Sequence, residues 1–128
     1  MNEAGPPSPL RAGETIGRPV VPYCTFCHII ARKEPATVRY EDGDVIVFDN
    51  LLRWVPVMLL VAPKRHVSQE ELWREMGSLG RVAVEMGKLY CPQGFRILSN
   101  FGHDAMQSQL HGHLHVLGGT HLGLYVAR

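Results

Sequence analysis

The chain lacks an excess of charge of either sign. Its 13 Lys and Arg residues nearly balance its 12 Asp and Glu residues, which leaves a formal net charge of +1 at pH 7. Binding to nucleic acid through a broad basic surface is therefore not expected. The sequence also lacks an apolar run of the ~18–20 residues that a membrane-spanning helix needs, so no membrane association is expected.

Cysteine is scarce as well. The three cysteines, Cys24, Cys27 and Cys91, do not make a disulfide framework, and we expect reduced thiols in a cytoplasmic protein. The opening stretch MNEAGPPSPLRAGETIGRP lacks the apolar centre of a signal peptide and is rich in Pro and Gly. We expect residues 1–20 to form a disordered tail and residues 21–128 to form one domain.

Short apolar segments separated by turn residues predict the secondary structure. A short helix is expected within residues 24–34, because Pro35 ends its pattern. Five strands are expected within residues 37–50 (two strands around a turn at Gly43), 57–66, 94–100 and 110–119. Strands and helices do not alternate regularly. We therefore expect an α+β fold, a five-stranded meandering antiparallel sheet with one long and one short helix.

The long helix is predicted over residues 68–90. Ser68 and Glu71 have the spacing of a capping box at its start. Apolar residues then follow at steps of four and three, as one helical stripe: Leu72, Met76, Leu79, Ala83, Met86 and Tyr90. Three glycines inside this pattern cost roughly 1 kcal/mol each relative to alanine, so tertiary packing must hold the helix.

Histidine is concentrated near the end of the chain. Five of the seven histidines lie after position 100, and three of them alternate in LHGHLHVLGG, residues 110–119. If this segment is a strand, His111, His113 and His115 share one face. The pattern alone leaves three interpretations open: a metal site, a solvated histidine-rich strand, and a row of catalytic imidazoles.

The loop before the histidines is compatible with catalysis. Asn100, Gln107 and Ser108 offer two amides and a hydroxyl, which can hold substrate oxygens and stabilise charge during phosphoryl or acyl transfer. A neutral imidazole nitrogen can attack phosphorus and later leave to water, which divides one difficult step into two.

The histidine pattern and its context resemble the histidine triad (HIT) nucleotide-binding family. The resemblance is carried by HGHLHVL and, in the same order as in the family, by CTFCHIIARKEPATVRYEDGDVIVFDN, LLVAPKRHVS and GFRILSN. It covers about residues 23–119. The continuation VLGG and Ser108 are most similar to the Hint-like branch, the purine nucleoside phosphoramidases. The resemblance implies a HIT domain over residues 21–128. It also implies a homodimer with a ten-stranded sheet, joined through the long helix and the strand Phe95–Asn100.

The resemblance also implies a role for each site residue. His113 would be the nucleophile that forms a nucleotidyl-histidine intermediate, and a backbone carbonyl would hold its far nitrogen. His111 and His115 would flank it, and Ser108 would assist the leaving group. The nucleotide would be bound by Asn100, Gln107 and Asn50, and its base by Phe26, Ile29, Phe48 and Leu51. These four apolar residues are equally suited to a hydrophobic core.

The implied reaction is hydrolysis of a purine nucleoside 5′-phosphoramidate to a nucleoside monophosphate and an amine, with no cofactor. Three alternatives remain: a dinucleoside polyphosphate hydrolase of the Fhit-like branch, a non-catalytic nucleotide-binding protein, and a metal-dependent hydrolase. A nucleotidyl transferase is disfavoured, because such relatives usually carry Gln where His115 stands.

Two positions of the nucleotide site depart from the family pattern. Asn50 stands where an acidic residue usually binds the ribose, and it can bond a diol only without charge assistance. Met106 stands where a glycine usually lets the backbone approach the phosphate.

The metal ligands of the family are also incomplete by this comparison. Many bacterial members hold a structural zinc with a C-x-x-C pair, a further histidine and the first triad histidine. Cys24, Cys27 and His111 match three of these, but the fourth position aligns with Met58, a poor zinc ligand. His28 and His66 are the possible substitutes, and neither has a spacing argument. We therefore expect no metal.

Overall fold

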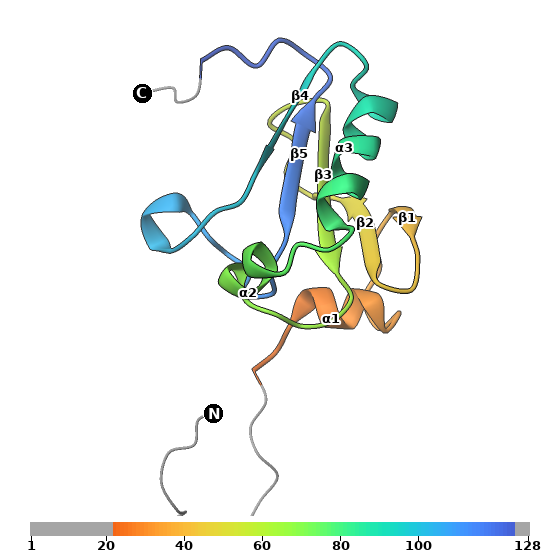
Figure 1. The fold of residues 1–128 in the computed structure, drawn as a ribbon, viewed down its shortest axis with the longest axis vertical. Helices are drawn as coiled ribbons and strands as arrows, with labels where there is room; N and C mark the ends of the chain where they lie inside the picture. Colours follow the sequence, from red (N-terminus) through yellow and green to blue (C-terminus); the bar gives the residue numbers. More distant parts are fainter. Residues whose placement is uncertain (1–21, 125–128) are drawn as a thin grey trace, which may run out of the picture.

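The computed structural model describes residues 22–124, so the predicted tail over residues 1–20 lies outside the described residues and is not tested. Five strands form one antiparallel sheet in the order β1-β2-β3-β5-β4 (Figure 1). The strands are β1 (Val38–Glu41), β2 (Val45–Asp49), β3 (Val57–Pro63), β4 (Phe95–Leu98) and β5 (Leu114–Gly118). The predicted α+β class and the antiparallel five-stranded sheet are confirmed.

The helices are α1 (Thr25–Ile30), α2 (Gln69–Arg74), α3 (Leu79–Tyr90) and the 3-10 turn η1 (His103–Ala105). The single helix predicted over residues 68–90 is wrong, because residues 75–78 separate α2 from α3 and Gly77 has φ +57°. The predicted capping box is present: the Ser68 hydroxyl accepts from the Glu71 N–H, and the Glu71 carboxylate accepts from the Ser68 N–H. The apolar stripe still faces the sheet, because the chain turns between the helices and both present their apolar residues to one core.

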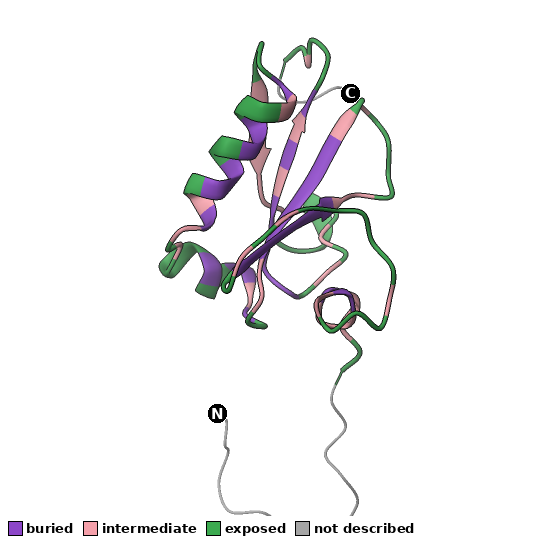
Figure 2. Cartoon of the chain, turned by 90° about the vertical axis from the view of Figure 1, so that its right-hand side faces the viewer, coloured by how far each residue is buried: buried purple, intermediate pink, exposed green. Residues whose placement is uncertain are grey.

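The two faces of the sheet are covered by different helices. Figure 2 shows α3 on one side of the sheet, with its buried residues turned inward, and α1 on the other side. The larger apolar cluster lies under α2 and α3, and the smaller one lies between α1 and the sheet. Alternation along β2 divides its residues between them, so Val45 and Val47 join the α3 side while Ile46 and Phe48 join the α1 side.

The last strand begins later than the sequence predicts. Only His115 of the three histidines lies within β5, and its ladder with β3 begins at the pair Val61 and Leu114. The ladder does not extend back to His111, because the N–H groups of Gly112 and His113 donate to partners outside the sheet. Leu110, the first residue of the segment predicted as this strand, is 73% exposed.

The turn between β1 and β2 is present as predicted, but Asp42 stabilises it rather than a positive φ at Gly43. The sequence suggests a positive φ at Gly43, but Gly43 is not among the described residues with positive φ. The Asp42 side chain makes the turn, since its carboxylate accepts from the N–H groups of Asp44 and Val45 at 2.7 and 2.8 Å. Within residues 22–124, no helix is long and apolar enough to cross a membrane.

Candidate active site

The three alternating histidines lie on the α1 side of the sheet. Leu114 and Val116 of β5 belong to the core under α3, so His115 between them faces the opposite way. Phe26 of α1 packs against the His113 ring with centroids 5.0 Å apart, and the His113 and His115 rings are also 5.0 Å apart. His111 and His113 are only 1% and 4% exposed. The interpretation as a solvated histidine-rich strand is therefore wrong for these two residues.

The His113 ring is held in one tautomer. Its Nδ1 lies 2.8 Å from the backbone carbonyl of His111, and a carbonyl oxygen can only accept. The proton therefore sits on Nδ1, and Nε2 keeps its lone pair. Burial lowers the pKa of His113 below its ordinary value. The ring is a neutral base at neutral pH, as a nucleophile must be.

His115 is also kept neutral. Burial, and secondarily the neighbouring His113, lower its pKa to about 4. A neutral imidazole beside His113 can donate one N–H to a bound oxygen without adding positive charge to the site. If both His113 and His115 were protonated, two cationic rings would lie side by side.

His111 points away from this pair, toward α1. Its Nε2 donates to the Pro63 carbonyl at 2.8 Å, which leaves the lone pair on Nδ1. That nitrogen lies 3.5 Å from the Cys24 Sγ and 3.6 Å from the Cys27 Sγ. His111 and His113 thus adopt opposite tautomers, and His111 faces two thiols.

A fourth ligand completes this group. His66 Nδ1 lies 3.3 Å from the Cys27 Sγ, and the ligand atoms of Cys24, Cys27, His66 and His111 all lie within 4.8 Å of one another. Zinc bonds of about 2.3 Å to sulfur and about 2.0 Å to nitrogen give tetrahedral edges of about 3.3–3.8 Å. The three sulfur–nitrogen separations of 3.3, 3.5 and 3.6 Å match such edges. The residues therefore fit a closed, four-ligand zinc site.

Met58, which aligns with the family's fourth ligand, is not part of this group, and His66, one of the two possible substitutes, is. The Met58 Sδ lies 3.1 Å from the Trp54 N–H, and Met58 is buried in β3. His28, the other possible substitute, lies against the Glu34 carboxylate at 3.4 Å. Burial, followed by the neighbouring Cys24, raises the pKa of the Cys27 thiol to about 11, so an incoming metal ion would have to displace its proton.

The loop between β4 and the histidines is open to solvent. Ser108 is exposed and Gln107 is half-buried. The Gln107 amide is used within the loop: its Oε1 accepts from the Gly102 N–H, and its Nε2 donates to the Gln109 carbonyl. One amide N–H of Gln107 stays available for a ligand. Met106 is 77% exposed and has φ +63°, the left-handed conformation for which glycine is favoured.

The residues expected to contact the base divide into two groups. Phe26, Ile29 and Phe48 are buried together in the core on the α1 side, whereas Leu51 is 96% exposed. Ile29 also borders a hollow of about 480 Å³ that residues 32–36 and Val38 complete. The core interpretation holds for Phe26, Ile29 and Phe48, and it is wrong for Leu51.

Asn50 and Asp49 divide as the alternation of a strand predicts. Arg39 grips the Asp49 carboxylate with two hydrogen bonds of 2.8 Å, and the same guanidinium lies over the Tyr90 ring of α3. Asp49 is thus engaged on the α3 side. The Asn50 Oδ1 accepts from the Leu52 N–H at 3.0 Å, which leaves the amide nitrogen of Asn50 to donate elsewhere.

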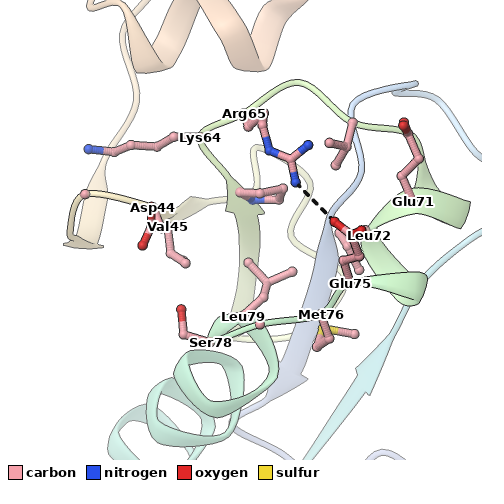
Figure 3. A pocket seen from close by; sticks show the side chains of 14 residues that line it. Asp44, Val45, Lys64, Arg65, Glu71, Leu72, Glu75, Met76, Ser78 and Leu79 are labelled. Atoms are coloured by element: carbon pink, nitrogen blue, oxygen red, sulfur yellow. Dashed lines mark ion pairs between the residues drawn. The ribbon is translucent and has the colours of Figure 1, made fainter.

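A separate cavity of about 310 Å³ lies between the ends of β2 and β3 and the α2–α3 connection (Figure 3). Val45, Leu72 and Leu79 form part of its apolar lining, and the exposed Arg65–Glu75 pair lies across it at 3.8 Å. None of the three alternating histidines lines it. This cavity therefore does not contain the imidazoles.

Two residues that the sequence did not single out contact the backbone of His113. The Ser99 hydroxyl donates to the His113 carbonyl at 2.8 Å. The buried Gln69 side chain accepts from the His113 N–H at 2.9 Å. No local pattern marks either residue, because a polar residue after a strand or at a helix start is ordinarily at the surface.

Comparison with known proteins agrees with this geometry. The HIT domain model matches residues 31–122. The protein HitA of Neisseria gonorrhoeae is 32% identical over 104 residues, which cover 74% of this chain and 94% of HitA.

Solved structures agree as well. A HIT family hydrolase from Clostridium thermocellum matches with a TM-score of 0.74 and 30% identity, over 84% of this chain and 100% of that one. A zinc-bound histidine triad family protein from Mycobacterium smegmatis matches with a TM-score of 0.64 and 27% identity, over 78% and 77% of the two chains. This chain therefore belongs to the HIT domain family of hydrolases and nucleotide-binding proteins.

Proposed function

We propose that the protein hydrolyses purine nucleoside 5′-phosphoramidates through a nucleotidyl-histidine intermediate on His113. The observation that carries the proposal is the hydrogen bond from His113 Nδ1 to the His111 carbonyl, in a buried and neutral ring. It leaves the Nε2 lone pair free to attack phosphorus.

The reaction proceeds in two balanced steps. His113 Nε2 forms a bond to phosphorus, the phosphorus–nitrogen bond breaks, and the amine leaves with the electron pair of that bond and a proton from the Ser108 hydroxyl. His115 donates an N–H to a phosphate oxygen or to the bridging atom. Water then attacks the same phosphorus, the phosphorus–Nε2 bond breaks, and one proton of the water restores the Ser108 hydroxyl. This step releases the nucleoside monophosphate and returns His113 to its neutral form.

The substrate's other groups are assigned to the surrounding residues. Asn100 and Gln107 bind phosphate and ribose, and the Asn50 amide contacts the ribose hydroxyls. The base is assigned to Leu51, which is 96% exposed, and to Ile29, which borders the hollow, while Phe26 and Phe48 pack behind Ile29 in the core. The three carboxamides, Asn50, Asn100 and Gln107, carry no charge, so ribose binding here relies on neutral hydrogen bonds.

A zinc ion is proposed to be structural. Cys24, Cys27, His66 and His111 would hold it, and four protein ligands leave no open position for substrate. The solved zinc-bound relative supports this assignment. Zinc would anchor α1 and His111 to one another.

We also propose a cytoplasmic homodimer. The three cysteines are free. Strand β4 is at one edge of the five-stranded sheet, and α3 beside it exposes Val84 and Leu89. An edge strand with an apolar neighbour is suited to joining a second sheet.

The test is release of AMP from adenosine 5′-phosphoramidate, with acid quench and mass analysis of the enzyme. We expect wild-type turnover and a nucleotidyl group on His113. His113→Ala should reduce kcat by roughly a thousandfold or more. The matched control, His103→Ala, changes a fully exposed histidine and should leave kcat unchanged.

Brief treatment with EDTA, AMP binding and turnover of a dinucleoside polyphosphate together distinguish the three alternatives. Immediate loss of wild-type activity with the fold intact by circular dichroism would favour a metal-dependent hydrolase. AMP binding without turnover of this substrate or of a dinucleoside polyphosphate would indicate a non-catalytic binding protein. Preference for the dinucleotide would assign the protein to the second hydrolase class.

A further inference from the structure

Gln69 is a buried polar residue in an exposed polar stretch. It is 1% exposed, whereas its neighbours Glu70 and Glu71 face solvent. Burying a primary amide without partners costs about 1–3 kcal/mol. A glutamine at the first turn of α2 could equally well face solvent, so the hydrogen-bond partners of Gln69 must account for its burial.

Those partners are two backbone groups near the two ends of the connection between β4 and β5. The Gln69 Oε1 accepts from the His113 N–H at 2.9 Å, and its Nε2 donates to the Asn100 carbonyl at 3.1 Å. An N–H can only donate and a carbonyl can only accept, so the pair of bonds admits one orientation of the amide. Gln69 thus joins the end of this connection that carries the nucleophile to the end that follows β4.

The nucleophile's backbone needs such partners, because His113 precedes β5. The Gly112 N–H donates to the Val67 carbonyl at 2.6 Å, beside the bond from His113 to Gln69. The Ser99 hydroxyl holds the His113 carbonyl from the other side. The start of α2 therefore replaces the missing ladder.

The fit at this contact is tight. A Cβ added to Gly112 would lie 2.7 Å from the Ser68 carbonyl oxygen and 3.1 Å from the Leu72 side chain. The backbone of residues 112 and 113 therefore lies directly against α2, where little displacement is possible. The His111 carbonyl that fixes the His113 tautomer is one peptide unit away.

We propose that Gln69 is a positioning residue, which sets His113 relative to the His111 carbonyl and to the proposed phosphate-binding Asn100. The inference rests on the proposed function for its kinetic part. Gln69 contacts no reacting atom. It acts by holding two backbone segments at a fixed separation, and displacements of about 1 Å at a reacting centre reduce rates by roughly a hundredfold.

The decisive variant is Gln69→Met, which keeps the length of the side chain and removes both hydrogen bonds. We expect kcat to fall by roughly tenfold to a hundredfold, with KM within about threefold of wild type. The matched control is Ser68→Ala, which removes the cap of α2 and leaves both Gln69 bonds in place. Its melting temperature should fall, and its kcat should not. Equal loss of kcat in the two variants at matched stability would overturn the proposal.

The imidazole ¹⁵N spectrum of His113 gives a readout that does not depend on turnover. Wild type should show a single tautomer with the proton on Nδ1, and Gln69→Met should show a mixture. Gln69→Glu keeps the acceptor toward His113 and loses the donor toward Asn100 until it is protonated. Its rate relative to wild type should therefore rise as the pH falls.

These readouts separate the two possible failures. An inactive wild type with a ¹⁵N shift in Gln69→Met would reject the proposed reaction and keep the positioning role. An active wild type, with kcat and His113 tautomer both unchanged in Gln69→Met, would reject the positioning role alone.

Discussion

The histidine segment, residues 111–115, and the loop just before it, residues 102–108, are neighbours in sequence and opposites in construction. The histidines are largely buried, and backbone groups select the tautomers of His111 and His113. The loop is mostly exposed, and the hydrogen bonds of Gln107 stay within residues 102–109. The imidazoles proposed to react are fixed before substrate binds, whereas the loop side chains proposed to contact substrate can still change position. Preorganisation matters most where charge moves.

The largest expected effect on stability comes from removing one of the four proposed zinc ligands, which include His111 of the histidine segment. Cys24→Ser keeps a side chain suited to cap α1 and removes one thiolate from the four-ligand group. We expect about one zinc per wild-type chain and almost none in the variant. In a hundredfold excess of zinc over its dissociation constant, the loss is about 3 kcal/mol of unfolding free energy.

The control for this change is Cys91→Ala, since Cys91 is not among the four ligand residues. It should retain zinc whatever its effect on packing. Metal analysis and urea unfolding, each with and without added zinc, give the comparison. A wild-type protein that takes up no zinc would contradict the assignment.

Acid should disrupt the same segment by charging it. His115 has a pKa of about 4 when folded against an ordinary value of 6.5, so the unfolded chain binds more protons between these values. Its stabilising contribution is therefore complete above about pH 6.5 and is lost as the pH falls toward 4. We expect this residue alone to cost about 2 kcal/mol of unfolding free energy between pH 7 and pH 5. Burial lowers the pKa of His111 and His113 too, which adds loss in the same direction.

Urea unfolding at the two pH values measures this effect. His115→Gln should flatten the dependence relative to wild type. His103→Gln, which alters a fully exposed ring in the loop, should leave the dependence as it is. Equal slopes in wild type and His115→Gln would show that His115 is not the group responsible.

The smallest effect is expected in the loop. Met106 has φ +63°, a left-handed conformation that glycine adopts without strain. For a residue with a side chain, this conformation has a steric cost of about 1 kcal/mol. Met106→Gly should relieve that cost, offset in part by the greater freedom of glycine in the unfolded chain. We expect a change of less than about 1 kcal/mol in unfolding free energy and less than about tenfold in kcat. A loss as large as that from Gln69→Met would mean that the loop is not the adjustable part of the site.

Much of the fold follows from local pattern. The strand runs, the Ser68–Glu71 capping box and the short helix with Phe26 and Ile29 inside are all present. The predictions that were wrong concern how segments meet. The helix breaks at residues 75–78, and the strand with the histidines starts at Leu114, because partners elsewhere in the chain compete with the local pattern.

The sequence by itself determined the α+β class, the strands and the presence of three alternating histidines, since periodicity and turn chemistry act over a few residues. Only the tertiary structure decided which partner each polar group finds. Cys24 meets His111 across 87 positions, His66 rather than Met58 joins them, and Gln69 reaches His113 across 44 positions. The physical reason is that a buried hydrogen bond depends on where two distant backbones come together, and no single segment carries that information.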